Sequence, residues 1–170
     1  GVTTVRDAAA DLSESVLSWR EQISKGELIG PTIYTSGPKL EGKGSIWPGD
    51  LEVETPQEMH AAIDKLDAMN VDFIKITDSA LTPALYLQAV KEVKKRGYKI
   101  SGHIPFSLSV TDVSSTGLDA IEHMTYLLKA AAKNEDEISA KVKTGELSYR
   151  SALPVVMNNI DKDTAMQKYR

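Results

Sequence analysis

Three side chains that could bind a metal ion stand at the ends of short apolar runs: Lys75, His103 and His123. The runs read VDFIKI, YKISGH and DAIEH, and they follow one another along the chain. Each run has the length and apolar character of a buried parallel strand. In parallel α/β folds, side chains at the carboxyl ends of neighbouring strands converge on one crevice. The order and position of the three residues therefore favour a metal site.

Each of the three residues also has a structural interpretation. Strand alternation places Lys75 on the same face as Val71 and Phe73, and a lysine near a strand end can extend its amine to water. A single histidine at a strand end is more often a hydrogen-bonded structural residue than a ligand. Two histidines in adjacent predicted strands, with a lysine in the strand before, favour metal binding over a structural role. A lysine amine can also add carbon dioxide to become a carbamate, a carboxylate able to bridge two metal ions.

Alternating strands and helices are expected to position these residues. The predicted strands cover residues 1–7, 31–37, 71–77, 98–103 and 119–123. The predicted helices cover residues 12–25, 55–69, 82–96 and 109–117, and a long loop rich in glycine and proline covers 38–54. Single helices between strands imply right-handed crossovers and a parallel sheet, so the fold class is α/β.

The β/α pattern stops at Met124, and residues 124–170 contain no convincing strand. We expect helices over Leu127–Val142 and Tyr149–Asn159, with Ser148 as a cap and Pro154 as a kink. The chain is therefore expected to have two parts, a β/α repeat over residues 1–123 and a helical insertion or appendage over residues 124–170.

The composition limits the function further. The 170 residues suffice for about one domain but not for an eight-stranded barrel, which takes about 250 residues. The net charge of -4 and the dispersed basic residues give no nucleic-acid footprint, and no long apolar run indicates a membrane span. Because there is no cysteine, any metal ligands must be nitrogen or oxygen atoms. No signal peptide is present, and the chain opens on GVTTVRD, so we expect a segment upstream of it.

The motifs GVTTVRD, GPTIYTSG, VDFIKI, SGH and IEH, in this order and spacing, resemble the metal-dependent amidohydrolase superfamily. The branch that they resemble contains imidazolonepropionase-like and Xaa-Pro dipeptidase-like members, and the resemblance covers residues 1–124. It implies a (β/α)8 TIM-type barrel with one or two divalent ions, most often zinc. By the same resemblance Lys75 would be the carbamylated bridging ligand, and His103 and His123 would bind the second ion. The implied reaction is hydrolysis of an amide or peptide bond by a metal-bound hydroxide.

Parts of the family pattern are absent from this chain. The His-x-His pair of the family's first strand and the aspartate of its last strand have no counterpart, so no catalytic residue is assigned. By this interpretation residues 1–123 supply about strands two to six of the barrel and at most half of the metal chemistry. We therefore expect the isolated chain to be inactive or very weakly active, and its open sheet edges favour a homo-oligomer.

Several alternatives stay open at this point. The chain could be a non-catalytic α/β domain that binds a ligand or a partner, with Lys75, His103 and His123 purely structural. Nitrogen and oxygen ligands do not distinguish zinc from manganese, iron or cobalt. The segment GPKLEGKG is similar to a phosphate-binding loop but lacks its last residue and its helix, so Trp47 in this loop is instead expected to contact substrate. The GHIP turn resembles that of exported bacterial members, which favours the periplasm or secretion.

Overall fold

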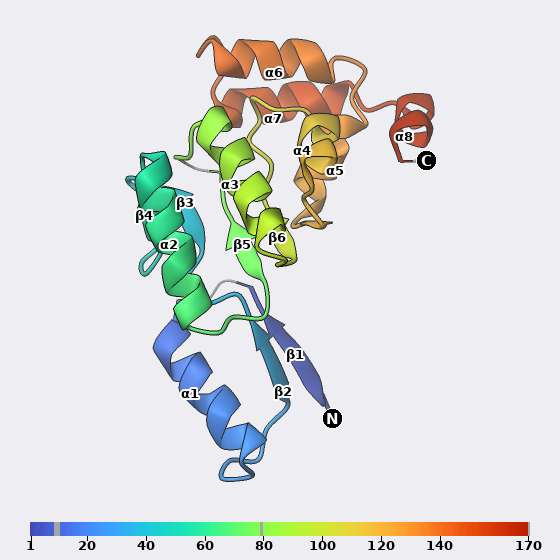
Figure 1. Cartoon of the computed structure of the whole chain (residues 1–170). Coiled ribbons are helices and arrows are strands. Elements are labelled where there is room, and N and C mark those ends of the chain that lie inside the picture. Colours follow the sequence, from blue (N-terminus) through green and yellow to red (C-terminus); the bar gives the residue numbers. More distant parts are fainter. Residues whose placement is uncertain (9–10, 79, 170) are drawn as a thin grey trace. The chain divides into compact units, whose positions relative to one another are not determined.

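The computed structural model describes residues 1–8, 11–78 and 80–169, which contain strands and eight helices of an α/β fold (Figure 1). The chain divides into two compact units, Gly1–Ser101 and Gly102–Arg170. The division falls within one strand, whereas the sequence analysis placed its boundary between residues 123 and 124. The predicted division into a β/α repeat over residues 1–123 and a helical insertion or appendage over residues 124–170 stays a prediction.

The first unit begins with two parallel strands joined by a helix. Strand β1 (Thr4–Asp7) pairs with β2 (Thr32–Thr35), and helix α1 (Ser13–Ser24) connects them. Gly26 follows the helix with a φ of 73°, the left-handed conformation that commonly ends a helix. These three elements confirm the strand, helix and strand expected in this region.

A second parallel sheet in the first unit has the strand order β4-β3-β5-β6. Its members are β3 (Leu40–Gly42), β4 (Leu51–Val53), β5 (Ile74–Ile76) and β6 (Ile100–Gly102). One backbone bond also joins the end of β2 to the segment just before β5: Asp72 N–H donates to the Thr35 carbonyl at 2.9 Å. The predicted strands over residues 31–37 and 71–77 are therefore neighbours, as expected for consecutive strands of a β/α repeat.

The prediction of a long loop over the whole of residues 38–54 was wrong, because this segment contains β3 and β4. Each strand has only three residues, which is too short for an alternation pattern to be recognised. Glu41 and Gly42 are also poor strand formers, yet they are fully enclosed in the sheet. Tertiary neighbours, not local propensity, make this segment a strand.

The two following helices match their sequence signals. Helix α2 (Pro56–Ala68) begins with a capping box in which Thr55 and Glu58 bind each other's backbone N–H groups. Helix α3 (Pro83–Lys95) begins at Thr82, whose side chain accepts a bond from Leu85 N–H. Both helices bury one apolar stripe, and each fully buried Leu, Ile or Val contributes about 1.5–3 kcal/mol. The buried residues are Met59, Ala62, Ile63 and Leu66 in α2, and Leu85, Tyr86, Ala89, Val90 and Val93 in α3.

The second unit contains one short strand and five helices in its described residues. In chain order they are α4 (Val110–Thr116), β7 (Ala120–Ile121), α5 (Met124–Ala130), α6 (Glu135–Lys143), α7 (Tyr149–Asn158) and α8 (Lys162–Lys168). Strand β7 lies beside the end of β6, since Glu122 N–H donates to the Gly102 carbonyl at 2.9 Å. The expected helix over residues 109–117 and the strand over 119–123 are thus present in shorter form.

The prediction of one helix over Leu127–Val142 was wrong, because the chain turns between α5 and α6. Ala132 forms an antiparallel bridge with Ile160, and Lys133 N–H donates to the Asn159 carbonyl at 3.1 Å. These long-range bonds use backbone groups that a continuous helix would need. Ser148 caps α7 as expected, and Pro154 lies inside that helix. None of the helices in the described ranges is long and apolar enough to cross a membrane.

Candidate metal site

Lys75 lies in the middle of β5, a strand of the first unit that is buried on both faces. Its exposed fraction is 4%, and Ile74 and Ile76 beside it are fully buried. Burial on both faces is usual for a strand inside a parallel sheet, so alternation does not separate an inner from an outer face here. A lysine in such a place requires partners or a change of its charge, which makes Lys75 more than a surface residue.

His103 and His123 belong to the second unit, and the structure brings their rings together. The ring centroids are 4.9 Å apart, and the ring planes enclose an angle of 53°. The cause is the bond between Glu122 N–H and the Gly102 carbonyl, which fixes the residues directly before the two histidines side by side. His103 is half-buried, whereas His123 is exposed. The juxtaposition of the imidazoles follows from the parallel strand ends.

His123 has a strained backbone. Its φ is 67° and its ψ is 136°, at the N-cap of α5. Residues other than glycine adopt positive φ rarely, and such a conformation costs about 1–3 kcal/mol. Strain of this kind persists where the surrounding structure or a function requires one particular side-chain direction. Here it accompanies the placement of the His123 ring beside His103.

Tyr126 supports the histidine pair from α5. Its ring stacks on His103 with centroids 5.4 Å apart and an interplanar angle of 24°. It is 5% exposed and lies 6.1 Å, centroid to centroid, from the ring of Phe106. Tyr126 is not among the residues predicted from the sequence, because the predicted helix begins at Leu127. A predicted helix that starts directly after His123 would place Tyr126 within one turn of this histidine and would mark it as a neighbour of the site.

The separation of the two rings equals that expected for two imidazoles on one ion, and it also lies in the ordinary range for aromatic pairs. If each ring nitrogen lies about 2.0–2.1 Å from an ion and the bonds enclose roughly a tetrahedral angle, the ring centres are about 5 Å apart. The observed 4.9 Å agrees with this distance. Among residues 1–8, 11–78 and 80–169, no three His, Cys, Asp or Glu side chains form a group that could hold a metal ion. Metal binding by the two imidazoles, and the proximity of Lys75 to them, therefore stay predictions.

A buried charged cluster in the second unit was also missed by the sequence analysis. The side chain of Lys129 is fully buried, donates to the Leu108 carbonyl and lies 3.9 Å from Glu135 Oε1. Glu135 also accepts a bond from Val110 N–H at 3.0 Å and pairs with Lys168. Burial lowers the pKa of Lys129 from 10.5 to about 8, although the charge of Glu135 acts in the opposite direction. No local pattern marks this cluster, because its members come from separate helices.

The segment that is similar to a phosphate-binding loop does not form one. It contains β3, whereas a phosphate loop would lead into a helix. Trp47 is 50% exposed, and the Lys39 amine lies 5.9 Å from its ring centroid. Lys39 is held by Asp11 and Asp50 at 3.0 Å each, so this loop is built around an ion-pair cluster. Contact of Trp47 with a substrate stays a prediction.

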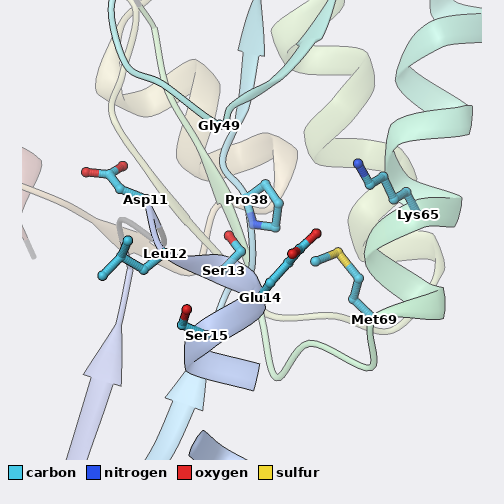
Figure 2. Close-up of a pocket in the computed structure, with 9 residues that line it drawn as sticks. All are labelled: Asp11, Leu12, Ser13, Glu14, Ser15, Pro38, Gly49, Lys65 and Met69. Atoms are coloured by element: carbon cyan, nitrogen blue, oxygen red, sulfur yellow. The ribbon is translucent and has the colours of Figure 1, made fainter. Parts of the chain in front are cut away.

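A cavity of about 360 Å³ lies in the first unit, between the start of α1 and α2. Figure 2 shows side chains from both helices around this space. The lining residues are Asp11, Leu12, Ser13, Glu14, Ser15, Pro38, Gly49, Lys65 and Met69. None of them is one of the three predicted metal ligands, and the acids and Lys65 give the cavity no dominant charge.

No protein-family model matches the chain, and no curated protein is similar enough to match. Solved structures do match. A bottromycin amidohydrolase shares 18% identity at a TM-score of 0.67, with 94% of this chain and 33% of that protein covered. A Xaa-Pro dipeptidase with bound methionine in its active site shares 18% identity at a TM-score of 0.58, with 98% and 51% covered. A prolidase complexed with N-methylphosphonate-L-proline shares 16% identity at a TM-score of 0.59, with 98% and 50% covered.

These likenesses show the fold of the chain. It is the fold of a part of amidohydrolase and prolidase structures, as the resemblance of the motifs implies. The chain spans only a third to a half of the length of the three structures. The partial TIM-type barrel expected from the motifs, with about strands two to six of eight, stays a prediction.

Proposed function

We propose that this chain is a segment of a metal-dependent hydrolase that cleaves amide or peptide bonds, and that it supplies imidazole ligands from His103 and His123. The observation that carries the proposal is the 4.9 Å separation of the two rings at the ends of neighbouring strands. The likeness to an amidohydrolase, a Xaa-Pro dipeptidase and a prolidase supports the class of reaction.

Lys75 enters the proposal as a carbamylated ligand of the same metal centre. Support comes from its motif and from its burial within β5, where an ordinary surface lysine would not be found. The ion is most simply zinc, since imidazole nitrogen and carbamate oxygen both suit it, although other divalent ions accept the same donors. When bound, a divalent ion would supply Lewis acidity, which polarises an amide carbonyl and lowers the pKa of a water molecule to about 7.

The protein's own residues have distinct roles in this proposal. His103 and His123 bind through one ring nitrogen each, and the strand ends fix their separation. Tyr126 stacks on His103 and restricts the rotation of that ring. No residue of this chain is assigned the proton transfer to the leaving amine, and we therefore propose that the isolated chain has little or no activity.

The substrate class is proposed to be a small amide or a dipeptide. The Xaa-Pro dipeptidase has bound methionine and the prolidase is complexed with N-methylphosphonate-L-proline, which supports substrates of this size. Assembly of the chain into a homo-oligomer and its export to the periplasm are further proposals, based on the open sheet edges and the GHIP turn.

Metal analysis of the purified chain tests the proposal. After dialysis against metal-free buffer and addition of zinc, the wild-type chain should retain about one ion, and His103→Ala and His123→Ala should each retain far less. His60→Ala is the matched control, because His60 is an exposed histidine on α2 that lies 3.5 Å from Glu92. Equal zinc in all four proteins would instead support the non-catalytic α/β domain.

A further inference from the structure

Glu41 is a buried carboxylate that accepts hydrogen bonds from three backbone amides. It lies in β3 and is fully buried. Its Oε1 accepts bonds from the N–H groups of Gly42 at 2.6 Å, Ala80 at 3.1 Å and Leu81 at 3.2 Å. Three amide dipoles on one carboxylate oxygen offset much of the cost of burying its charge. Two of these amides belong to the segment that leads from β5 to α3.

Gly42 holds the same segment by close packing. A Cβ atom added at Gly42 would lie 2.2 Å from the carbonyl carbon of Ala80 and 2.3 Å from the nitrogen of Leu81. The peptide bond between Ala80 and Leu81 therefore rests directly on the Cα atom of Gly42. Only glycine allows this approach, so the packing is a second observation that this peptide is fixed to β3.

The fixed peptide stands at the exit of the strand that carries Lys75. Two residues after Lys75, Thr77 N–H donates to the Leu40 carbonyl at 3.0 Å, which closes the pairing of β5 with β3. Leu81 directly precedes Thr82, the N-cap of α3. Thr77 and the Ala80–Leu81 peptide are thus each attached to β3. Both lie after the carboxyl end of β5, on the side of the sheet where ligands of parallel α/β folds gather.

We propose that Glu41 is a positioning residue for Lys75, acting through the Ala80–Leu81 peptide. Its carboxylate holds the Ala80–Leu81 peptide against β3, which keeps water away from the end of β5 and keeps Lys75 buried. The inference rests on the proposed function, because it concerns the persistence of the carbamate on Lys75. When the carbamate nitrogen takes up a proton from water, its N–C bond breaks and leaves the amine and carbon dioxide. Keeping water away from the end of β5 therefore preserves the carbamate.

The test compares Glu41→Gln and Glu41→Asp with the wild-type 170-residue chain. Glutamine removes the charge from the acceptor, and aspartate keeps the charge but withdraws it by one methylene. Glu58→Gln is the matched control, because Glu58 also accepts backbone N–H bonds, from Glu54 at 2.7 Å and Thr55 at 3.0 Å, at a different place.

Two measurements are made on each protein. Hydrogen exchange at the Ala80 and Leu81 amides should become about tenfold faster in both Glu41 variants, because a charge-assisted acceptor is weakened or lost. The carbon-13 NMR signal of a lysine carbamate, formed with labelled bicarbonate and zinc and absent in Lys75→Arg, should fall to less than about a third of the wild-type intensity. Glu58→Gln should leave both unchanged.

The outcomes separate the inference from the proposed function. A wild-type carbamate signal that persists at full intensity in both Glu41 variants overturns the inference alone, and so does unchanged exchange at Ala80 and Leu81. A wild-type chain with no carbamate signal contradicts the proposed role of Lys75 and removes the basis of the inference. A selective loss in the Glu41 variants supports both.

Discussion

Replacing the buried Lys129 should change the pH dependence of folding stability. The amine is enclosed by the Leu108 carbonyl, the Phe106 ring at 5.5 Å and Glu135, while Lys168, Asp136 and Asp112 add charge from other helices. Its pKa is lowered from 10.5 to about 8, with burial as the main cause. Such a fall corresponds to a penalty of about 3 kcal/mol for the protonated amine in the folded chain.

The sign of the effect follows from the direction of this pKa change. Because the folded pKa is below the unfolded one, the penalty is fully present below about pH 8 and disappears as the pH approaches the unfolded value of 10.5. Lys129→Met keeps an unbranched side chain that is one atom shorter and removes the charge. Near pH 7 we expect the variant to be more stable than the wild type by about 2 kcal/mol, after loss of one hydrogen bond worth about 1 kcal/mol.

The assay is urea unfolding of both proteins, followed by circular dichroism, at pH 7, 8, 9 and 10. The stability difference between variant and wild type should fall by about 2–3 kcal/mol over this range. Lys141→Met is the control, since Lys141 lies on the surface of α6 in an ion pair with Glu137 at 2.7 Å and its pKa is raised. Its difference from the wild type should be constant up to pH 10. A constant difference for Lys129→Met as well would refute the reasoning.

Three further predictions concern single contacts. Gly42→Ala should destabilise the chain by about 3 kcal/mol or more, measured by urea unfolding, because its Cβ would overlap the Ala80 peptide; a loss below about 1 kcal/mol would show that the segment moves away easily. Thr55→Ala should cost about 1 kcal/mol through loss of the α2 cap, and an unchanged unfolding midpoint would contradict the capping box. Tyr126→Leu should weaken zinc binding while Tyr126→Phe preserves it, measured by competition with a chelator, because the stacked ring holds His103; equal affinities would exclude that role.

Much of the fold could be predicted because its signals are local. Thr55 with Glu58 and Thr82 with Pro83 mark the starts of α2 and α3, and the structure places both helices there. Gly97 and Gly117 likewise follow α3 and α4 with positive φ. Such caps depend on residues within one turn of each other, so the sequence alone contains the information.

The missed elements depend on distant neighbours. β3 is a strand because β4 and β5 lie on both sides of it, although Glu41 and Gly42 disfavour a strand locally. The break between α5 and α6 depends on backbone bonds between residues far apart in the chain, such as the bond from Lys133 to Asn159, which lies 26 positions later. No periodicity within a short window reports these contacts.

The candidate site also contains both residues that the sequence predicts and residues that it does not. The ends of consecutive strands predicted that His103 and His123 would lie together, because parallel strands end at one edge. The stacking of Tyr126 and the burial of Lys129 could not be predicted, since they depend on where α5 begins and on how α5, α6 and α8 pack. The positive φ of His123 is likewise imposed by its surroundings, not by residue type.

The central claim is that the imidazoles of His103 and His123 bind the same divalent ion. X-ray absorption at the zinc edge of the zinc-loaded chain tests it most directly, because scattering from imidazole rings reports the number of histidine ligands. We predict two histidine ligands in the wild type and in His60→Ala, and at most one around the smaller amount of zinc that His103→Ala and His123→Ala retain. A zinc shell with no histidine, or one that is the same in all four proteins, would contradict the claim.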